Sequence, residues 1–178
     1  MANFTLPGLD DDAAESVRSV LQERLVALID TALTLKHIHW NVVGPSFIGV
    51  HEMIDPQVEA VQLMADAVAE RIAAMGGSPN GLAGNLVKAR TWDDYPVNRG
   101  LVPDHLEALD VAYSGLIGDH RSAIEAAGKV DPVTEDLLIS QTGALEQFQW
   151  FVRAHLETAD GTLSTADADR EAAADPRG

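Results

Sequence analysis

Five side chains in the first half of the chain have the chemistry of metal ligands: His39, His51, Asp55, Asp66 and Glu70. Imidazole nitrogens and carboxylate oxygens are ligands that iron, manganese and zinc accept. The chain contains no cysteine, so thiolate ligands and disulfide bonds are excluded. The residue types therefore point to a metal site built from nitrogen and oxygen ligands.

The spacing of four of these residues places them on one face of a helix. His51 and Asp55 are four residues apart, as are Asp66 and Glu70, so each pair shares a helical face. The eleven-residue step between the pairs is close to three whole turns, which keeps both pairs on the same side. Their midpoints nevertheless lie fifteen residues apart, or about 22 Å at 1.5 Å per residue. One or two adjacent ions cannot bridge that distance.

A second copy of the chain could close this gap. If two such helices cross antiparallel about a two-fold axis near residues 60 and 61, His51 and Asp55 of one copy meet Asp66 and Glu70 of the other. The spacing therefore predicts a site that exists only in a dimer and occurs twice in it.

Each candidate ligand also has an ordinary alternative when it is taken alone. His39 could be a core histidine, and Asp55 could cap a helix. Asp66 and Glu70 could form a solvated face, and Glu70 could pair locally with Arg71. The five residues together, at these spacings, favour the metal site.

Two helices must position these residues. Apolar side chains recur at steps of three or four from residue 17 to residue 35, and His39 ends this stripe. A Gly-Pro pair then breaks the pattern, and Ser46 is expected to cap a second helix over residues 47–75. Pro56 predicts a kink near Glu52, the alternative being a helix that starts at Pro56 with Asp55 as its cap.

The rest of the chain predicts a long crossover and two further helices. Residues 76–103 are rich in glycine, proline and asparagine, with a short helix expected over residues 82–89. A third helix is expected over residues 103–127, where Gly115 and Gly118 could allow close packing, and a fourth over residues 131–158. No strand pattern of useful length is present. The predicted fold is all-α, a ferritin-like four-helix bundle with one long crossover between the second and third helices.

Length and hydropathy predict one domain without membrane association. Of the 178 residues, we expect residues 15–160 to form the bundle, residues 1–14 an N-terminal tail and residues 161–178 a flexible acidic C-terminal tail. No apolar run reaches the roughly 18 residues of a membrane span, and the N-terminus lacks the pattern of a signal peptide. A cytoplasmic location is expected, with association with the nucleoid as an alternative.

The charge of the chain argues against a nucleic-acid surface. Its net charge is −16, and phosphate binding depends on lysine and arginine. From residue 158 onward five acids face only two arginines. An acidic excess suits the attraction and storage of cations, and it serves solubility equally well.

A run of fixed positions between residues 36 and 71 closely resembles one known family. These positions are Lys36, His39-Trp40-Asn41, Gly44-Pro45-Ser46-Phe47, His51, Asp55, Asp66 and Glu70-Arg71. They resemble the Dps family, the DNA-binding proteins from starved cells, which are miniature ferritins. The likeness is to actinobacterial members, and residues 15–160 follow the family's layout.

The resemblance implies a homo-oligomer, a hollow dodecamer, with ferroxidase sites at its two-fold interfaces. One subunit would supply His39, His51 and Asp55, and its mate Asp66 and Glu70. Each site would hold two iron ions, with zinc or manganese as substitutes. It would oxidise iron(II) with hydrogen peroxide in preference to oxygen and store the ferric mineral, which protects the cell from oxidative damage. Beside the site, Trp40 could intercept radicals or could simply pack.

Further expectations concern iron entry and alternative functions. Asp131, Glu135 and Asp136 fall where relatives line a three-fold pore, so we expect them to guide cations, although acids at a helix start also complement its dipole. A different function would be compaction of DNA with incidental metal sites. Relatives that coat DNA often use lysine-rich tails, so weak or no DNA binding is expected here. A third possibility is a metal-dependent hydrolase with zinc or manganese at the same ligands.

Overall fold

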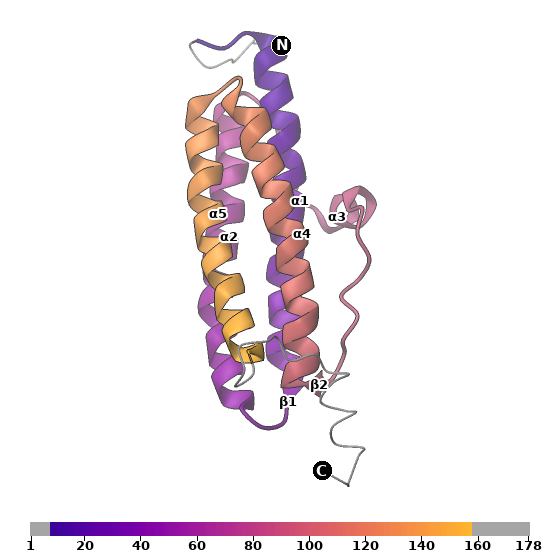
Figure 1. Cartoon of the computed structure of the whole chain (residues 1–178). Helices are drawn as coiled ribbons and strands as arrows, with labels where there is room; N and C mark the ends of the chain where they lie inside the picture. Colours follow the sequence, from indigo (N-terminus) through magenta and orange to yellow (C-terminus); the bar gives the residue numbers. More distant parts are fainter. Residues whose placement is uncertain (1–7, 158–178) are drawn as a thin grey trace, which may run out of the picture.

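Four long helices lie side by side and form a bundle in the computed structural model, which describes residues 8–157 (Figure 1). They are α1 (Asp11–Asn41), α2 (Phe47–Ala74), α4 (Val102–Gly128) and α5 (Pro132–Leu156), and a short α3 (Ala83–Ala89) stands to one side. The helices pair mainly as two hairpins, α1 with α2 and α4 with α5. The long connection from α2 to α4 runs outside the bundle. The predicted four-helix bundle with one long crossover is confirmed.

Helix α1 begins earlier than the sequence predicted. The carboxylate of Asp10 accepts a hydrogen bond of 2.7 Å from the backbone N–H of Ala13, so it satisfies one of the donors that a helix start leaves open. Asp11 and Asp12 follow in the first turn, where negative charge complements the helix dipole. Ala14 is fully buried. Helix α1 thus begins four residues before the predicted domain start at residue 15.

The turn into α2 differs from the expected cap. Ser46 does occupy the N-cap position, but its φ of 63° is left-handed and its side chain makes no capping hydrogen bond. The backbone closes the turn, because the N–H of Phe47 donates to the carbonyl of Gly44 at 3.1 Å. The predicted side-chain cap is therefore wrong. Helix α2 is continuous through Pro56, so the alternative that it starts at Pro56 is also wrong. The kink near Glu52 stays a prediction.

The crossover carries one short helix and ends in a small strand pair. Helix α3 lies within the predicted residues 82–89 and contacts α1. Beyond it, β2 (Gly100–Leu101) pairs in parallel with β1 (Val42–Val43), which directly follows α1. The sequence pattern does not predict these two short strands. This pair fastens the end of the crossover to the end of the bundle where α1 turns into α2 (Figure 1).

Helices α4 and α5 start close to the predicted positions. Pro132 is the first residue of α5, and the side chain of Asp131 accepts from the backbone N–H groups of Val133 and Thr134. The expectation for Gly115 and Gly118 is wrong within one chain, because a Cβ atom added at either glycine would meet nothing within 4 Å. Both glycines face outward, and the core between α4 and its neighbours is filled by larger residues such as Leu106, Leu109 and Tyr113.

Of the remaining predictions, only the one on membrane spans can be compared with the described residues. No helix within residues 8–157 is long and apolar enough to cross a membrane. The predicted end of the bundle at residue 160, the C-terminal tail over residues 161–178 and the first seven residues of the N-terminal tail lie outside the described residues.

Candidate metal centre

The end of α1 and the start of α2 bring two candidate ligands into contact. His39 lies in the last turn of α1, and His51 lies one turn into α2. Their imidazole rings are stacked, with centroids 3.7 Å apart and planes at 23°. The two residues are twelve positions apart in sequence. The turn between the helices is therefore what assembles this pair.

Backbone carbonyls fix the tautomer of both rings. Nδ1 of His39 lies 3.1 Å from the carbonyl oxygen of His51, and Nδ1 of His51 lies 2.9 Å from the carbonyl oxygen of His39. A carbonyl can only accept, so each Nδ1 carries the proton. In the neutral imidazole the lone pair then lies on Nε2, which is the usual arrangement of a metal-binding histidine held by a second hydrogen bond. The carbonyl of His39 is available because the last turn of a helix leaves such groups unpaired.

Asp55 lies beside His39 and forms an ion pair with Lys36. Its Oδ1 lies 3.2 Å from Nδ1 of His39 and 2.9 Å from Nζ of Lys36. The hydrogen bond from Lys36 is the main cause that lowers the pKa of Asp55 below its ordinary value, with smaller contributions from the nearby histidines. The carboxylate is therefore kept ionised, which is the form that binds a cation.

Asp66 and Glu70 lie elsewhere on α2 and do not reach this group. They follow Asp55 by eleven and fifteen residues, or about 16 and 22 Å along the helix. Both are exposed, and neither has a hydrogen-bond or ion-pair partner within residues 8–157. The structure thus brings His39, His51 and Asp55 together and leaves the other two carboxylates open to solvent.

A single chain offers no complete metal site in its described part. No group of three or more histidine, aspartate or glutamate side chains between residues 8 and 157 is arranged to hold an ion. The contacts of His39, His51 and Asp55 are made with one another, with Lys36 and with the backbone. That a partner subunit completes the site stays a prediction at this point.

Large apolar side chains are exposed around the candidate ligands. Trp40 follows His39 and is 71% exposed, with its ring centroid 5.9 Å from Nζ of Lys36. Ile48 and Leu63, on the same side of α2 as the acids, are 58% and 70% exposed. Exposed apolar residues that gather on one face commonly mark a contact surface.

The structure decides between several of the alternative roles. Arg71 does not pair with Glu70, because its guanidinium binds Asp131 at 2.5 Å and the hydroxyl of Thr134 at 3.0 Å. Asp55 lies inside α2 and caps nothing. The histidines outside the motif lie elsewhere: His37 contacts the carbonyl of Val97, His105 and His120 are buried, and His155 is exposed.

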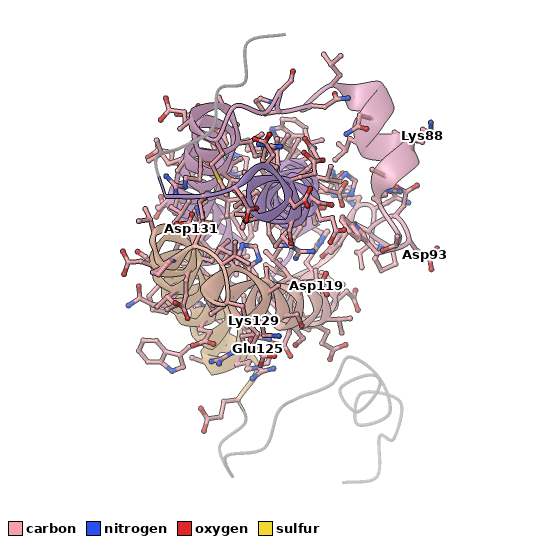
Figure 2. The ribbon with its side chains drawn as sticks, turned by 90° about the horizontal axis from the view of Figure 1, so that it is seen from above. Lys88, Asp93, Asp119, Glu125, Lys129 and Asp131 are labelled. Carbon is pink, nitrogen blue, oxygen red and sulfur yellow. The ribbon has the colours of Figure 1, made fainter. Side chains whose placement is uncertain are left out.

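Of the three candidate pore acids, one has a structural role. Asp131, which Figure 2 shows at the end of the bundle, is buried and binds Arg71 and Thr134 while it caps α5. Burial would raise its pKa, but the hydrogen bonds from Thr134 and Arg71 outweigh burial and lower it. Glu135 is partly exposed and Asp136 is exposed. These two remain available to a passing cation.

Lys36 contacts the candidate ligands, and the sequence alone does not show this role. It precedes His39 by three residues, so both side chains lie on one face of α1, and its ammonium group binds the candidate ligand Asp55. The spacing to His39 was visible in the sequence. The contact with Asp55 depends on how α1 lies against α2, which the sequence pattern does not show.

Comparisons with known proteins identify the family of the chain. The family model described as a ferritin-like domain matches residues 19–162. The chain is 58% identical over 164 residues to the DNA protection during starvation protein of Mycolicibacterium smegmatis, covering 92% of this chain and 90% of that protein. A solved structure of Mycobacterium smegmatis Dps superposes with a TM-score of 0.90 at 58% identity, covering 92% of this chain and 99% of that one. Dps from Microbacterium arborescens in its high-iron form has a TM-score of 0.78 at 26% identity and covers 84% and 97%. The chain therefore belongs to the Dps family of ferritin-like proteins.

Proposed function

We propose that the protein oxidises iron(II) at sites shared between two subunits and stores the ferric product. One observation carries this proposal: the candidate ligands His39, His51 and Asp55 lie close together where α1 ends and α2 begins, while Asp66 and Glu70 stand open further along α2 without partners in the described chain. An antiparallel pair of α2 helices would bring the two groups together. The high-iron form of the Microbacterium relative supports iron as the metal.

The exposed face of α2 is suited to a contact with a second copy. It presents the apolar side chains of Ile48 and Leu63 beside the acids Asp55, Asp66 and Glu70. Apolar contact would supply the association energy, because buried apolar area drives most protein association. The acids of two facing helices repel one another unless cations lie between them. Iron bound between subunits would therefore stabilise the same contact that completes its site.

The chemistry at such a site is a two-electron oxidation in which iron(II) is the substrate. Two iron(II) ions each give one electron to one molecule of hydrogen peroxide, whose O–O bond breaks. With two further water molecules this yields two FeOOH units and four protons. The protein contributes Nε2 of the two histidines and the carboxylates as ligands, which hold the two ions close enough to react as a pair. Zinc or manganese could occupy the same ligands, and zinc, which has no redox chemistry, could not supply this electron transfer.

Anaerobic loading followed by peroxide tests the proposed function. Iron(II) is added to the protein without oxygen, peroxide is then titrated, and ferric absorbance is followed by stopped flow. We expect rapid oxidation with an end point at about two iron ions per peroxide. An end point at one iron per peroxide, or a rate equal to that of iron(II) in buffer, would contradict the proposed two-electron reaction.

Storage requires a closed shell, so we propose a dodecamer in the cytoplasm. The likeness to solved Dps structures supports the dodecamer. Light scattering on the purified protein measures the number of subunits directly. In such an assembly Trp40, now exposed beside His39, would lie next to the shared site. There it could pack against the partner, intercept radicals, or do both.

We propose that Glu135 and Asp136 help to guide iron into the shell. The Glu135→Gln/Asp136→Asn double variant is expected to lower the initial rate of iron uptake at low salt, with a smaller effect at high salt because ions screen the attraction. Asp131 is left unchanged, since its loss would disturb α5. Equal initial rates for the variant and the natural protein at low ionic strength would show that these acids guide no iron.

Binding to DNA is the second candidate function, because the Mycolicibacterium relative is named for DNA protection. The net charge of −16 opposes it. We expect no stable complex in a gel-shift assay at about 150 mM salt and neutral pH, where phosphate contacts are already weakened. Retention of DNA under those conditions would favour a nucleoid role.

Removal of iron from solution can protect DNA without any contact between the protein and the DNA. No feature of the described residues supports the alternative of a metal-dependent hydrolase.

A further inference from the structure

A cavity of about 550 Å³ lies between the crossover and the bundle, away from the candidate metal ligands. Its walls are α1 around Asp30 and Thr34, the crossover segment 91–96, and the stretch of α4 from Ala108 to Asp119. We call it the crossover cavity. Its volume falls within the range of pockets that bind small molecules.

The crossover is pinned to the bundle at two points along the wall of the cavity. At one point Trp92 Nε1 donates to Asp30 at 2.6 Å and Arg90 binds the same carboxylate at 3.2 Å. At the other point the hydroxyl of Tyr95 donates to the carbonyl of His105 at 2.9 Å. The hollow is therefore held open by specific contacts on both sides.

The charge of the lining is strongly one-sided. Four aspartates line the cavity, Asp30, Asp93, Asp94 and Asp119, and no lysine, arginine or histidine is among the described residues that line it. From outside the lining, Arg90 binds Asp30 and Asp94, and Arg24 binds Asp119 at 3.4 Å. Asp93 has no partner within residues 8–157. Two negative charges remain in excess, so the cavity selects against anions.

The rest of the lining is apolar or aromatic. Leu109 and Leu116 of α4 contribute aliphatic surface, and Trp92 and Tyr95 contribute rings. Burial raises the pKa of Tyr95, so its hydroxyl stays neutral. Aromatic faces attract cations, and aliphatic surface favours a ligand with a hydrocarbon body. The lining thus matches a cation that carries methylene groups.

The spacing of the aspartates suits such a ligand better than a metal ion. No three histidine, aspartate or glutamate side chains within the described chain lie close enough together to hold one ion. The aspartates come instead from three elements: Asp30 from α1, Asp93 and Asp94 from the crossover, and Asp119 from α4. Separated negative charges fit a ligand whose positive charges are separated too.

We infer that the crossover cavity binds a linear aliphatic polyamine, with its ammonium groups near the aspartates and its methylene chain against α4. This inference does not depend on the ferroxidase activity. Binding would link the crossover more firmly to α1 and α4, so it would also raise the thermal stability of the protein.

Calorimetric titration of the full-length assembled protein with spermidine tests the inference. We expect saturable binding of one spermidine per subunit and a higher melting temperature. 1-Aminopentane, with one charge, and MgCl₂ at matched ionic strength should bind at least about tenfold more weakly, because neither pairs separated charges with a hydrocarbon chain. Absence of saturable spermidine binding at millimolar concentration would overturn the inference.

Two variants and one control locate the binding. Ala112→Leu fills the cavity from α4 and should weaken binding by about tenfold or more, while Asp93→Asn should weaken it by about three- to fivefold, as expected for an exposed charge. Glu125→Gln removes an exposed acid of α4 outside the cavity (Figure 2) and should leave affinity unchanged. Circular dichroism checks that each variant is folded. If Asp93→Asn and Glu125→Gln weaken binding equally and Ala112→Leu has no effect, spermidine binds only to the general negative charge, and the inference is wrong.

Discussion

His39→Ala and Asp66→Ala are each expected to slow the fast peroxide-dependent oxidation of iron(II) by about 100-fold or more. Loss of a residue that only supports a metal ligand already lowers activity by about 10- to 100-fold. The two residues lie far apart within one chain, at the end of α1 and in the second half of α2. Equal losses from two such distant changes follow only if both side chains serve one site. Stopped-flow measurement of ferric absorbance after anaerobic loading gives the rates.

Glu125→Gln is the matched control for these variants, since it removes an exposed acid from a helix that carries none of the candidate ligands. It should keep the natural rate. Light scattering and circular dichroism establish that the variants assemble and fold. A variant that is folded, assembled and still shows the fast phase would remove that residue from the site.

Asp131→Ala is expected to lower the free energy of unfolding by about 2–4 kcal/mol, because it removes a helix cap and leaves Arg71 without its buried partner. The carboxylate accepts from the Arg71 guanidinium and the Thr134 hydroxyl, both at 2.5 Å, and from the backbone at the start of α5. These contacts tie the end of α2 to the start of α5. Chemical denaturation followed by circular dichroism measures the loss.

Asp10→Ala provides the comparison for this variant. Asp10 caps α1 in the same way, but no ion pair involves it in the part of the chain that the structure describes, so its loss should cost only about 1 kcal/mol. Equal costs for the two variants would show that the ion pair with Arg71 adds nothing.

The carboxylate of Asp131 also predicts how the stability of the protein depends on pH. The folded state lowers the pKa of Asp131 below its ordinary value of 3.8, so its contribution is fully present above that pH. It is lost as the pH falls through the lower, folded-state pKa. The natural protein should therefore lose more stability than Asp131→Ala between neutral pH and strongly acidic pH. Parallel loss in both proteins would contradict the pairing.

The helices and the shared face of α2 that carries the candidate ligands could be predicted because both follow from the 3.6-residue period. Steps of three and four placed His39 at the end of α1, and steps of four and eleven placed the acids of α2 on one face. The Gly-Pro turn and the proline at the start of α5 marked element boundaries for equally local reasons.

Features that depend on how distant segments meet could not be predicted. The parallel pairing of Val42 with Gly100 joins segments almost sixty residues apart, and nothing in either dipeptide signals it. The contact of Lys36 with Asp55 depends on the position of α1 against α2, and the crossover cavity depends on two contacts that pin the loop. Asp131 was expected in a pore from its acidity and position. Its contact with Arg71, sixty residues away, became visible only in three dimensions.

Mixing the two inactive variants tests the shared site most directly. His39→Ala and Asp66→Ala subunits, with different affinity tags, are produced together, and assemblies that carry both tags are purified. In a mixed pair one site has lost both residues and the other has both intact, so random pairing should restore about a quarter of the natural number of sites. We predict that the mixed assembly regains fast peroxide-dependent oxidation at about that fraction. Activity no higher than that of the two pure variants would show that each site belongs to a single chain, and would contradict this account.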